Sequence, residues 1–182
     1  MSRLPLPSRD QMTDAQRDVH DAIVDGPRGR IQGPFPVWLR CPEMADRAQK
    51  LGQYFRFETS LPRDLAEIAI CVTGAHYKAE FEWWAHAQFA RDEGVSEDVL
   101  EAIRTGREPV FEDIKSKTVY QTARALNERH RLSDDEYAMA VQVLGEEGLV
   151  EVIGLCGYYA LVSLTLNVAE VPTPDASRAF DV

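Results

Sequence analysis

Glu82 and His86 are the residues of this sequence best placed to do chemistry together. They stand four residues apart in the segment EFEWWAHAQFA, so in a helix both side chains lie on one face, about one turn from each other. A carboxylate beside an imidazole forms a proton relay, because it fixes the ring tautomer, raises the basicity of the ring and leaves the other nitrogen free to exchange a proton. The pair therefore predicts general acid–base chemistry.

A Glu and a His at this spacing also occur as a solvated pair on a helix surface, and the surroundings decide between the two interpretations. The segment has the pattern of a half-buried helix, in which a Glu or a His costs free energy unless it finds a partner. Burial would raise the pKa of the carboxylate and lower that of the imidazole, while attraction between opposite charges opposes both shifts. The sequence leaves the net direction open.

Three other side chains are candidates for a substrate site around this pair. Arg56, in the stretch QYFRF, is the candidate for holding a substrate carboxylate, with an ordinary surface arginine as the alternative. His76 is a candidate second base, and its alternative is a satisfied histidine at a helix end. Trp83, next to Glu82, is a candidate wall of the substrate site.

The elements that must position these residues all have helical spacing. Apolar residues recur at helical intervals, and capping residues and glycines mark the ends; the sequence predicts helices over 14–24, 43–57, 79–93 and 112–130, one that starts at Ser60-Leu61-Pro62, one that runs from Ser96 to Gly106, and two after Ser133 that are separated by Gly145. No alternating strand pattern of useful length occurs. We therefore expect an all-α, single-domain helical bundle over 1–182, with an N-terminal helix and packed loop (1–42) and an extended C-terminal tail (171–182).

Composition excludes several classes of protein. The chain has 30 acidic and 20 basic residues, a net charge of −10 and no Lys/Arg cluster in the sequence, so nucleic acid is not an expected partner. Cys41, Cys71 and Cys156 are far apart and indicate no disulfide framework. The first residues lack an apolar signal-peptide core, which favours the cytoplasm.

One segment, 152–169, carries no charged residue and approaches the length of a membrane span. It contains small and polar residues and lacks a basic flank, so we expect it to be buried in the core or in a subunit interface, and we expect no membrane association.

The run from Leu61 to Gly106 resembles the core motif of the carboxymuconolactone decarboxylase family, to which alkylhydroperoxidase D is related. The features that carry the resemblance are a Pro-initiated helix with an inward Glu, an EWxxH segment, a Gly-Val-Ser turn and a short Ala-Ile helix. PEMADRAQKLGQYFRFETSLP and VIGLCGYYALVSLTLN resemble the longer members of the family. The resemblance spans about 13–172 and implies the helical fold of alkylhydroperoxidase D.

The peroxidase branch of this family has a glutamate, a CxxC pair and a histidine four residues later. On this sequence Glu67 matches the glutamate and His86 the histidine, whereas Ala79 and Glu82 stand at the two cysteine positions. Thiol–disulfide chemistry needs two thiols, so the resemblance argues against alkyl hydroperoxidase activity. Glu67, Glu82 and His86 remain as the expected catalytic residues.

The resemblance therefore implies cofactor-free acid–base chemistry, a decarboxylation or proton transfer, on a small unsaturated or lactone carboxylic acid, as in the breakdown of aromatic compounds. A divalent metal on the carboxylates and imidazoles is the less favoured reading, because no HxxxH or HxH pair occurs and the family is cofactor-free. The main alternative is a non-catalytic, oligomeric ligand-binding protein. We expect a homo-oligomer, as a dimer, trimer or hexamer.

Overall fold

The computed structural model describes residues 2–181, and within them it contains helices and no strand. The elements in chain order are a 3-10 turn η1 (Arg9–Gln11) and the helices α1 (Asp14–Asp25), α2 (Phe35–Trp38), α3 (Pro42–Phe57), α4 (Arg63–His76), α5 (Glu80–Asp92), α6 (Glu97–Thr105), α7 (Ile114–Arg129) and α8 (Asp134–Ala169). The predicted all-α class is confirmed.

The capping residues of the sequence place most helix boundaries correctly. Thr13 and Ser133 form the predicted capping boxes of α1 and α8, and Ser96 accepts the N–H of Val99 at the start of α6. The predicted start at Ser60 is wrong: α4 begins after Pro62, and Ser60 instead donates its backbone N–H and its hydroxyl to the buried carboxylate of Glu151, at 2.9 and 2.7 Å. Ser60 therefore binds a carboxylate of α8 and does not cap α4.

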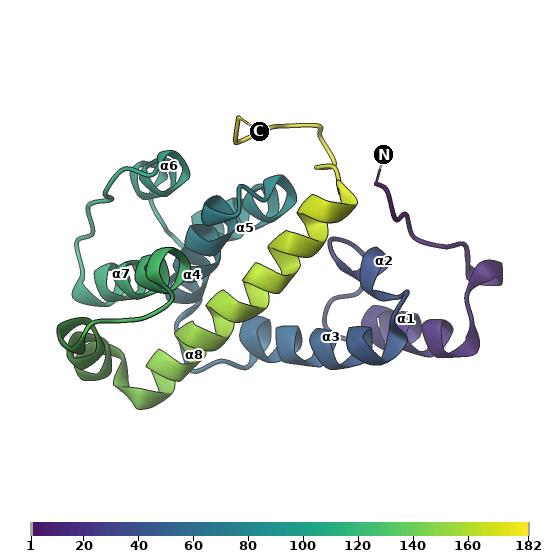
Figure 1. The fold of residues 1–182 in the computed structure, drawn as a ribbon, viewed down its shortest axis with the longest axis horizontal. Coiled ribbons are helices and arrows are strands. Elements are labelled where there is room, and N and C mark those ends of the chain that lie inside the picture. The colour runs from purple at the N-terminus through teal and green to yellow at the C-terminus, as the bar shows by residue number, and fades with distance from the viewer. Residues whose placement is uncertain (1, 182) are drawn as a thin grey trace.

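Helix α4 lies at the centre of the bundle. Ten consecutive residues of this helix, 65–74, are buried, because α5, α6, α7 and α8 all pack against it. Helix α8 crosses the molecule diagonally and also packs against α3, α5 and α7 (Figure 1). The bundle core therefore sits between α4 and α8.

Helix α8 is broken at Gly145, as the sequence predicts. That glycine has φ 76° and ψ 169°. Residues that carry a Cβ disfavour such a positive φ, whereas glycine adopts it readily. The part after the break is apolar and long enough to cross a membrane by length and composition alone. More than half of its most apolar window, 56%, is buried inside the protein, as in a core helix.

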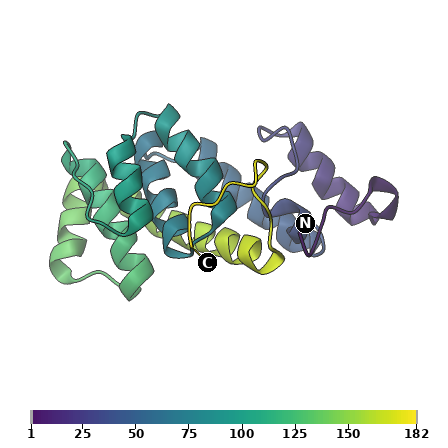
Figure 2. The same cartoon turned by 90° about the horizontal axis from the view of Figure 1, so that it is seen from above.

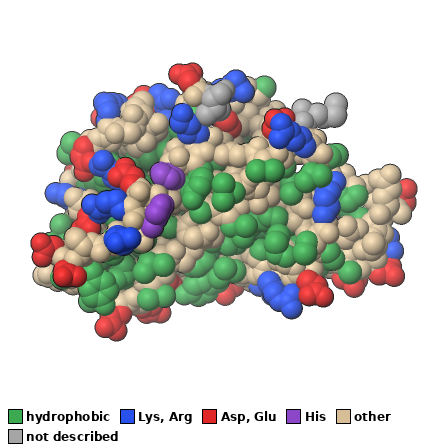
Figure 3. Space-filling view, viewed as in Figure 1, with side chains coloured by type: hydrophobic (Ala, Val, Ile, Leu, Met, Phe, Trp, Pro, Cys, Tyr) green, Lys and Arg blue, Asp and Glu red, His purple; other side chains and the backbone are tan. Residues whose placement is uncertain are grey.

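The other face of α8 is apolar and exposed. Hydrophobic side chains gather over α8 and α3 on the face seen in Figure 3. On α8 they form a stripe at helical spacing, with exposed fractions of 41 to 67%, made of Val150, Ile153, Leu161, Leu164 and Val168. We call this set the α8 stripe.

Both ends of the described chain pack on the bundle. The N-terminal helices and the loop between them lie at one end of the molecule. The predicted loop is packed, since Phe35, Trp38 and Leu39 are buried in the core and Val37 is half-buried. The tail after α8 runs back over α5 (Figure 2). There the carboxylate of Glu80 accepts the N–H groups of Ala179 and Phe180, at 2.6 and 3.1 Å. The predicted extended tail is therefore tied to this chain's own bundle.

Candidate active site

Glu67, Glu82 and His86 meet in the interior, where α4 packs against α5. His86 Nδ1 lies 2.6 Å from Glu67 Oε2, and His86 Nε2 lies 3.7 Å from Glu82 Oε2. All three residues are buried, with 2 to 5% of their surface exposed. The three residues expected to carry the chemistry therefore form a linear array, with the imidazole between two carboxylates.

The two carboxylates of the array have different surroundings. Burial raises the pKa of Glu82, an effect that His86 opposes and Glu67 reinforces. The other carboxylate, that of Glu67, lies near a guanidinium, with its Oε1 3.9 Å from Arg63 Nη2. Burial thus holds Glu82 closer to its neutral, proton-donating form than a carboxyl group in water would be. Glu67 is placed to accept the Nδ1 proton of His86.

A pocket of about 260 Å³ opens on one side of the array. Glu82 and His86 belong to its wall, whereas Glu67 lies behind the imidazole and does not line it. The remaining wall is aromatic and cationic, and its main members are Arg28, Arg56, Phe35, Phe57, Phe81, Phe89, Tyr158 and Tyr159. A bound molecule would contact Glu82 and His86 directly, and Glu67 would act on it only through its hydrogen bond to the histidine.

Arg56, the predicted carboxylate holder, reaches this pocket from α3. Its Cζ lies 4.8 Å from the ring centre of Phe89 and 5.2 Å from that of Phe57. Its Nε is buried and has no hydrogen-bond partner among residues 2–181. A guanidinium in a pocket wall that has a buried, unused donor is suited to bind an anion.

Two tyrosines of α8 complete the wall next to the array. The ring of Tyr159 packs edge to face against His86, with 4.9 Å between ring centres. Burial raises the pKa of Tyr159 well above its ordinary value and that of Tyr158 to about 12, so both phenols stay neutral at physiological pH. They can therefore donate hydrogen bonds but bring no negative charge.

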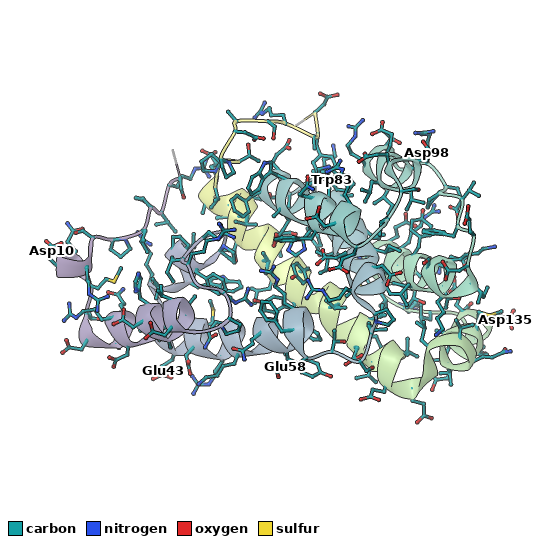
Figure 4. All side chains as sticks on the ribbon, turned by 180° about the vertical axis from the view of Figure 1, so that it is seen from behind. Asp10, Glu43, Glu58, Trp83, Asp98 and Asp135 are labelled. Carbon is teal, nitrogen blue, oxygen red and sulfur yellow. The ribbon has the colours of Figure 1, made fainter. Side chains whose placement is uncertain are left out.

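Two residues predicted for the substrate site lie elsewhere. His76 is exposed at the C-terminal end of α4, where its ring contacts Tyr77, and it lines a different cavity. Trp83, labelled in Figure 4, lines a neighbouring cavity instead, because consecutive residues of a helix point about 100° apart. Its ring packs against Phe180 of the tail. Neither residue lines the pocket that holds Glu82 and His86.

Comparison with solved structures gives a match over nearly the whole chain. A crystal structure described as the alkylhydroperoxidase AhpD core of an uncharacterized peroxidase-related protein from Ralstonia eutropha JMP134 superposes with a TM-score of 0.76, covering 96% of this chain and 93% of that one. The chain has the AhpD fold. Identity between the two sequences is 14%, so the likeness is one of fold. No protein-family model and no curated protein matches this sequence.

The cysteines of this AhpD-fold chain lie away from the pocket. Ala79 is buried at the start of α5 and Glu82 follows it, so the two positions matched to a redox cysteine pair hold no thiol. Cys71 is buried, and burial, reinforced by Glu67, raises the pKa of its thiol well above the ordinary value; burial raises that of Cys156 to about 11. Cys41 is exposed at the start of α3. None of the three lines the pocket.

Arg28, Tyr158 and Tyr159 are pocket residues that the sequence analysis did not select. Arg28 lies in the Gly- and Pro-rich loop 26–34, and an irregular loop gives no periodicity that would show the direction of its side chain. Tyr158 and Tyr159 lie in a helix that is apolar nearly all round, so its sequence pattern does not show which residues face a pocket. One available signal was the pair of arginines in GPRGR, inside an otherwise apolar packed loop.

Proposed function

We propose that the protein binds a small unsaturated or lactone carboxylic acid and performs cofactor-free acid–base chemistry on it, either a proton transfer or a decarboxylation. The observation that carries this proposal is the array Glu67–His86–Glu82 at the wall of a pocket that also contains Arg56. Acid–base catalysis on such a substrate needs a positioned proton donor, a pocket that excludes water and a cation near the carboxylate.

The geometry gives each residue of the array a distinct role. Glu82, whose pKa is raised by burial, is the proton donor that faces the ligand. His86 is the base, or the group that returns a proton to Glu82, and Glu67 accepts its Nδ1 proton and so orients the ring. Glu67 is thereby a positioning residue, while Glu82 and His86 are the catalytic pair.

The same groups serve either reaction. In a proton transfer, His86 removes the proton next to a carbonyl group and Glu82 protonates the conjugated end of the resulting dienolate. In a decarboxylation, the C–C bond electrons pass into the conjugated carbonyl system as CO₂ leaves, and Glu82 gives its proton to the carbon. Solvent then reprotonates Glu82 through His86. The net change is loss of CO₂ and gain of one proton, and no oxidant is required.

A screen of unsaturated keto acids and lactone acids tests the proposal. We expect one of them to release CO₂, or to exchange a carbon-bound hydrogen with D₂O, at a rate that falls by a factor of about 10² to 10⁴ in His86→Ala, the range contributed by a positioned acid or base. His76→Ala is the matched control, because that histidine is exposed outside the pocket. Equal turnover in wild type and His86→Ala would contradict the assignment.

The alternative is that the pocket binds an acid without turning it over, in a non-catalytic protein. The burial of Glu67, Glu82 and His86 in one array beside the pocket favours the enzyme, since a structural remnant would have no reason to keep three titratable groups in the interior. Binding of an acid with no CO₂ release and no exchange across the screen would favour this alternative.

A further inference from the structure

Arg28 is a partly buried cation whose buried nitrogens have no hydrogen-bond partner among residues 2–181. Its loop brings the side chain into the pocket, where Cζ lies 4.8 Å from the ring centre of Phe35. Both Nε and Nη2 are buried, and neither has a hydrogen-bond partner among residues 2–181. Burial of hydrogen-bond donors without acceptors costs free energy. A bound ligand that accepts hydrogen bonds from Nε and Nη2 would remove this cost, which explains why such donors are kept in the pocket.

A glycine on α3 makes room for this guanidinium. A Cβ added at Gly52 would lie 2.7 Å from Arg28 Nη2 and 2.5 Å from Cζ of Tyr158, and it would collide with the Tyr158 hydroxyl. Gly52 lies inside a helix and is not at a positive φ, so its backbone does not require glycine. The missing side chain instead creates a notch that holds Arg28 and the Tyr158 hydroxyl side by side.

The second guanidinium of the pocket comes from the next turn of α3. Arg56 lies four residues after Gly52 and lines the same pocket, and its buried Nε likewise has no partner within residues 2–181. The two like charges repel each other, and Glu82 attracts both of them from the same pocket wall. Among residues 2–181, however, no carboxylate forms a hydrogen bond or an ion pair with either guanidinium. An oxyanion bound between them would neutralise the repulsion and supply the missing acceptors.

We propose that Arg28, Arg56 and the Tyr158 hydroxyl form a receptor for one carboxylate group, with Gly52 as the residue that allows it to assemble. The planar fork of a guanidinium matches the two oxygens of a carboxylate, and the neutral phenol adds a third donor. The phenylalanines of the wall receive the flat, apolar body of the acid. The receptor rests on the proposed function for its ligand class and adds the residues that select an acid over its neutral counterpart.

Benzoate and benzamide are suitable probes, because they share size and shape and differ in charge. By calorimetry we expect benzoate to bind the wild-type protein at least tenfold more tightly than benzamide. Arg28→Met should weaken benzoate at least tenfold and leave benzamide unchanged. Arg28→Lys should fall between the two, since it keeps the charge and loses the fork. Gly52→Ala should weaken benzoate by displacing both Arg28 and Tyr158. Arg47→Met, on the exposed side of α3, is the control.

Thermal unfolding without ligand separates a receptor from a structural arginine. If Arg28 serves binding, Arg28→Met removes two buried donors that lack acceptors, and its Tm should equal or exceed that of the wild type. Benzoate should raise the Tm of the wild type only. A lower Tm together with unchanged benzoate affinity would make Arg28 a structural residue and overturn the receptor.

The receptor is also overturned if the wild-type protein binds benzoate and benzamide equally, or binds neither. These outcomes are independent of turnover. Selective binding of benzoate by a protein that turns over no acid would reject the proposed enzyme and leave the receptor in place, whereas turnover that is insensitive to Arg28→Met would do the reverse.

Discussion

The carboxylate of Glu67 stands behind the ring of His86, 2.6 Å from Nδ1, on the side away from the pocket. The two residues are 19 positions apart, on α4 and α5, so this contact exists only because the two helices pack together. It fixes the ring with Nε2 directed toward Glu82.

We expect Glu67→Gln to lower both activity and stability. The amide keeps the shape but removes the charge behind His86, so turnover of a substrate acid should fall about a hundredfold or more. The free energy of unfolding should fall by about 1–3 kcal/mol, the cost of impairing a buried hydrogen bond to a charged group. Glu93→Gln is the control, because Glu93 is close to the same Arg63 but is exposed. Wild-type turnover in Glu67→Gln would show that the contact does not orient the base.

The free energy of unfolding of the Glu82→Gln variant, relative to that of the wild type, should increase as the pH rises. Burial holds the pKa of Glu82 above its ordinary 4.5, so from pH 4.5 upward the unfolded state ionises first and the wild type loses stability until the folded carboxyl has ionised as well. Gln does not titrate. Urea unfolding between pH 4.5 and 8 should therefore show a difference between variant and wild type that moves in the variant's favour, by about 1.4 kcal/mol for each unit by which the pKa is raised. A constant difference would contradict the raised pKa.

The protein should have no thiol-dependent peroxidase activity, although its structural neighbour is described as peroxidase-related. The positions matched to the redox pair are Ala79 and Glu82, and burial raises the pKa of the thiols of Cys71 and Cys156. Consumption of cumene hydroperoxide with dithiothreitol should match that of a variant with all three cysteines replaced by serine. A rate that is lost in the cysteine-free variant would contradict the expectation.

We propose that the α8 stripe pairs with a second copy of the chain. Its residues stand 3, 8, 3 and 4 positions apart, with the exposed Gly157 in the gap of eight, so the stripe has similar apolar ends and a small residue near its centre. Two such stripes can pack antiparallel about a two-fold axis, with no charged residue between 152 and 169 to oppose contact. The alternative partner for the α8 stripe would be an unrelated protein.

Light scattering at micromolar concentration tests this pairing. The wild-type protein should be a dimer or a larger homo-oligomer, and the double variant Leu161→Asp, Leu164→Asp should be a folded monomer. Val110→Asp, at an apolar residue that is 87% exposed outside the stripe, should leave the assembly intact. A monomeric wild-type protein would reject the proposal.

The sequence predicted the features that depend on local signals and missed those that depend on contacts between distant parts of the chain. Capping boxes and left-handed glycines act within a few residues, and so the boundaries of α1, α6 and α8 followed from the sequence. Ser60 misled because the competing acceptor, Glu151, lies 91 residues away. For the same reason the sequence could pair Glu82 with His86 by spacing, whereas Glu67 was selected only through a resemblance and its position behind the ring was not predicted.

The pocket wall was the least predictable part. Arg56 was selected by type, but His76 and Trp83 were selected because they are near Glu82 in sequence, and nearness along a helix does not determine which side a residue faces. Arg28 and Tyr158 meet only at the notch of Gly52, through three separate segments. The absence of an Lys/Arg cluster in the sequence likewise did not exclude two arginines in one pocket.

The buried carboxylate of Glu151 bears on any effort to redesign this protein for other substrates. It accepts hydrogen bonds from Tyr54 and Ser60; burial alone would raise its pKa, but these bonds outweigh that effect and lower it. Tyr54 precedes Arg56 by two residues on α3, and Glu151 precedes Tyr158 by two turns on α8. The bond between Tyr54 and Glu151 therefore joins α3 to α8 within two turns of the residues that line the pocket. A library that varies the pocket should leave that distant pair unaltered, because changing it would move the arginine and the tyrosines together.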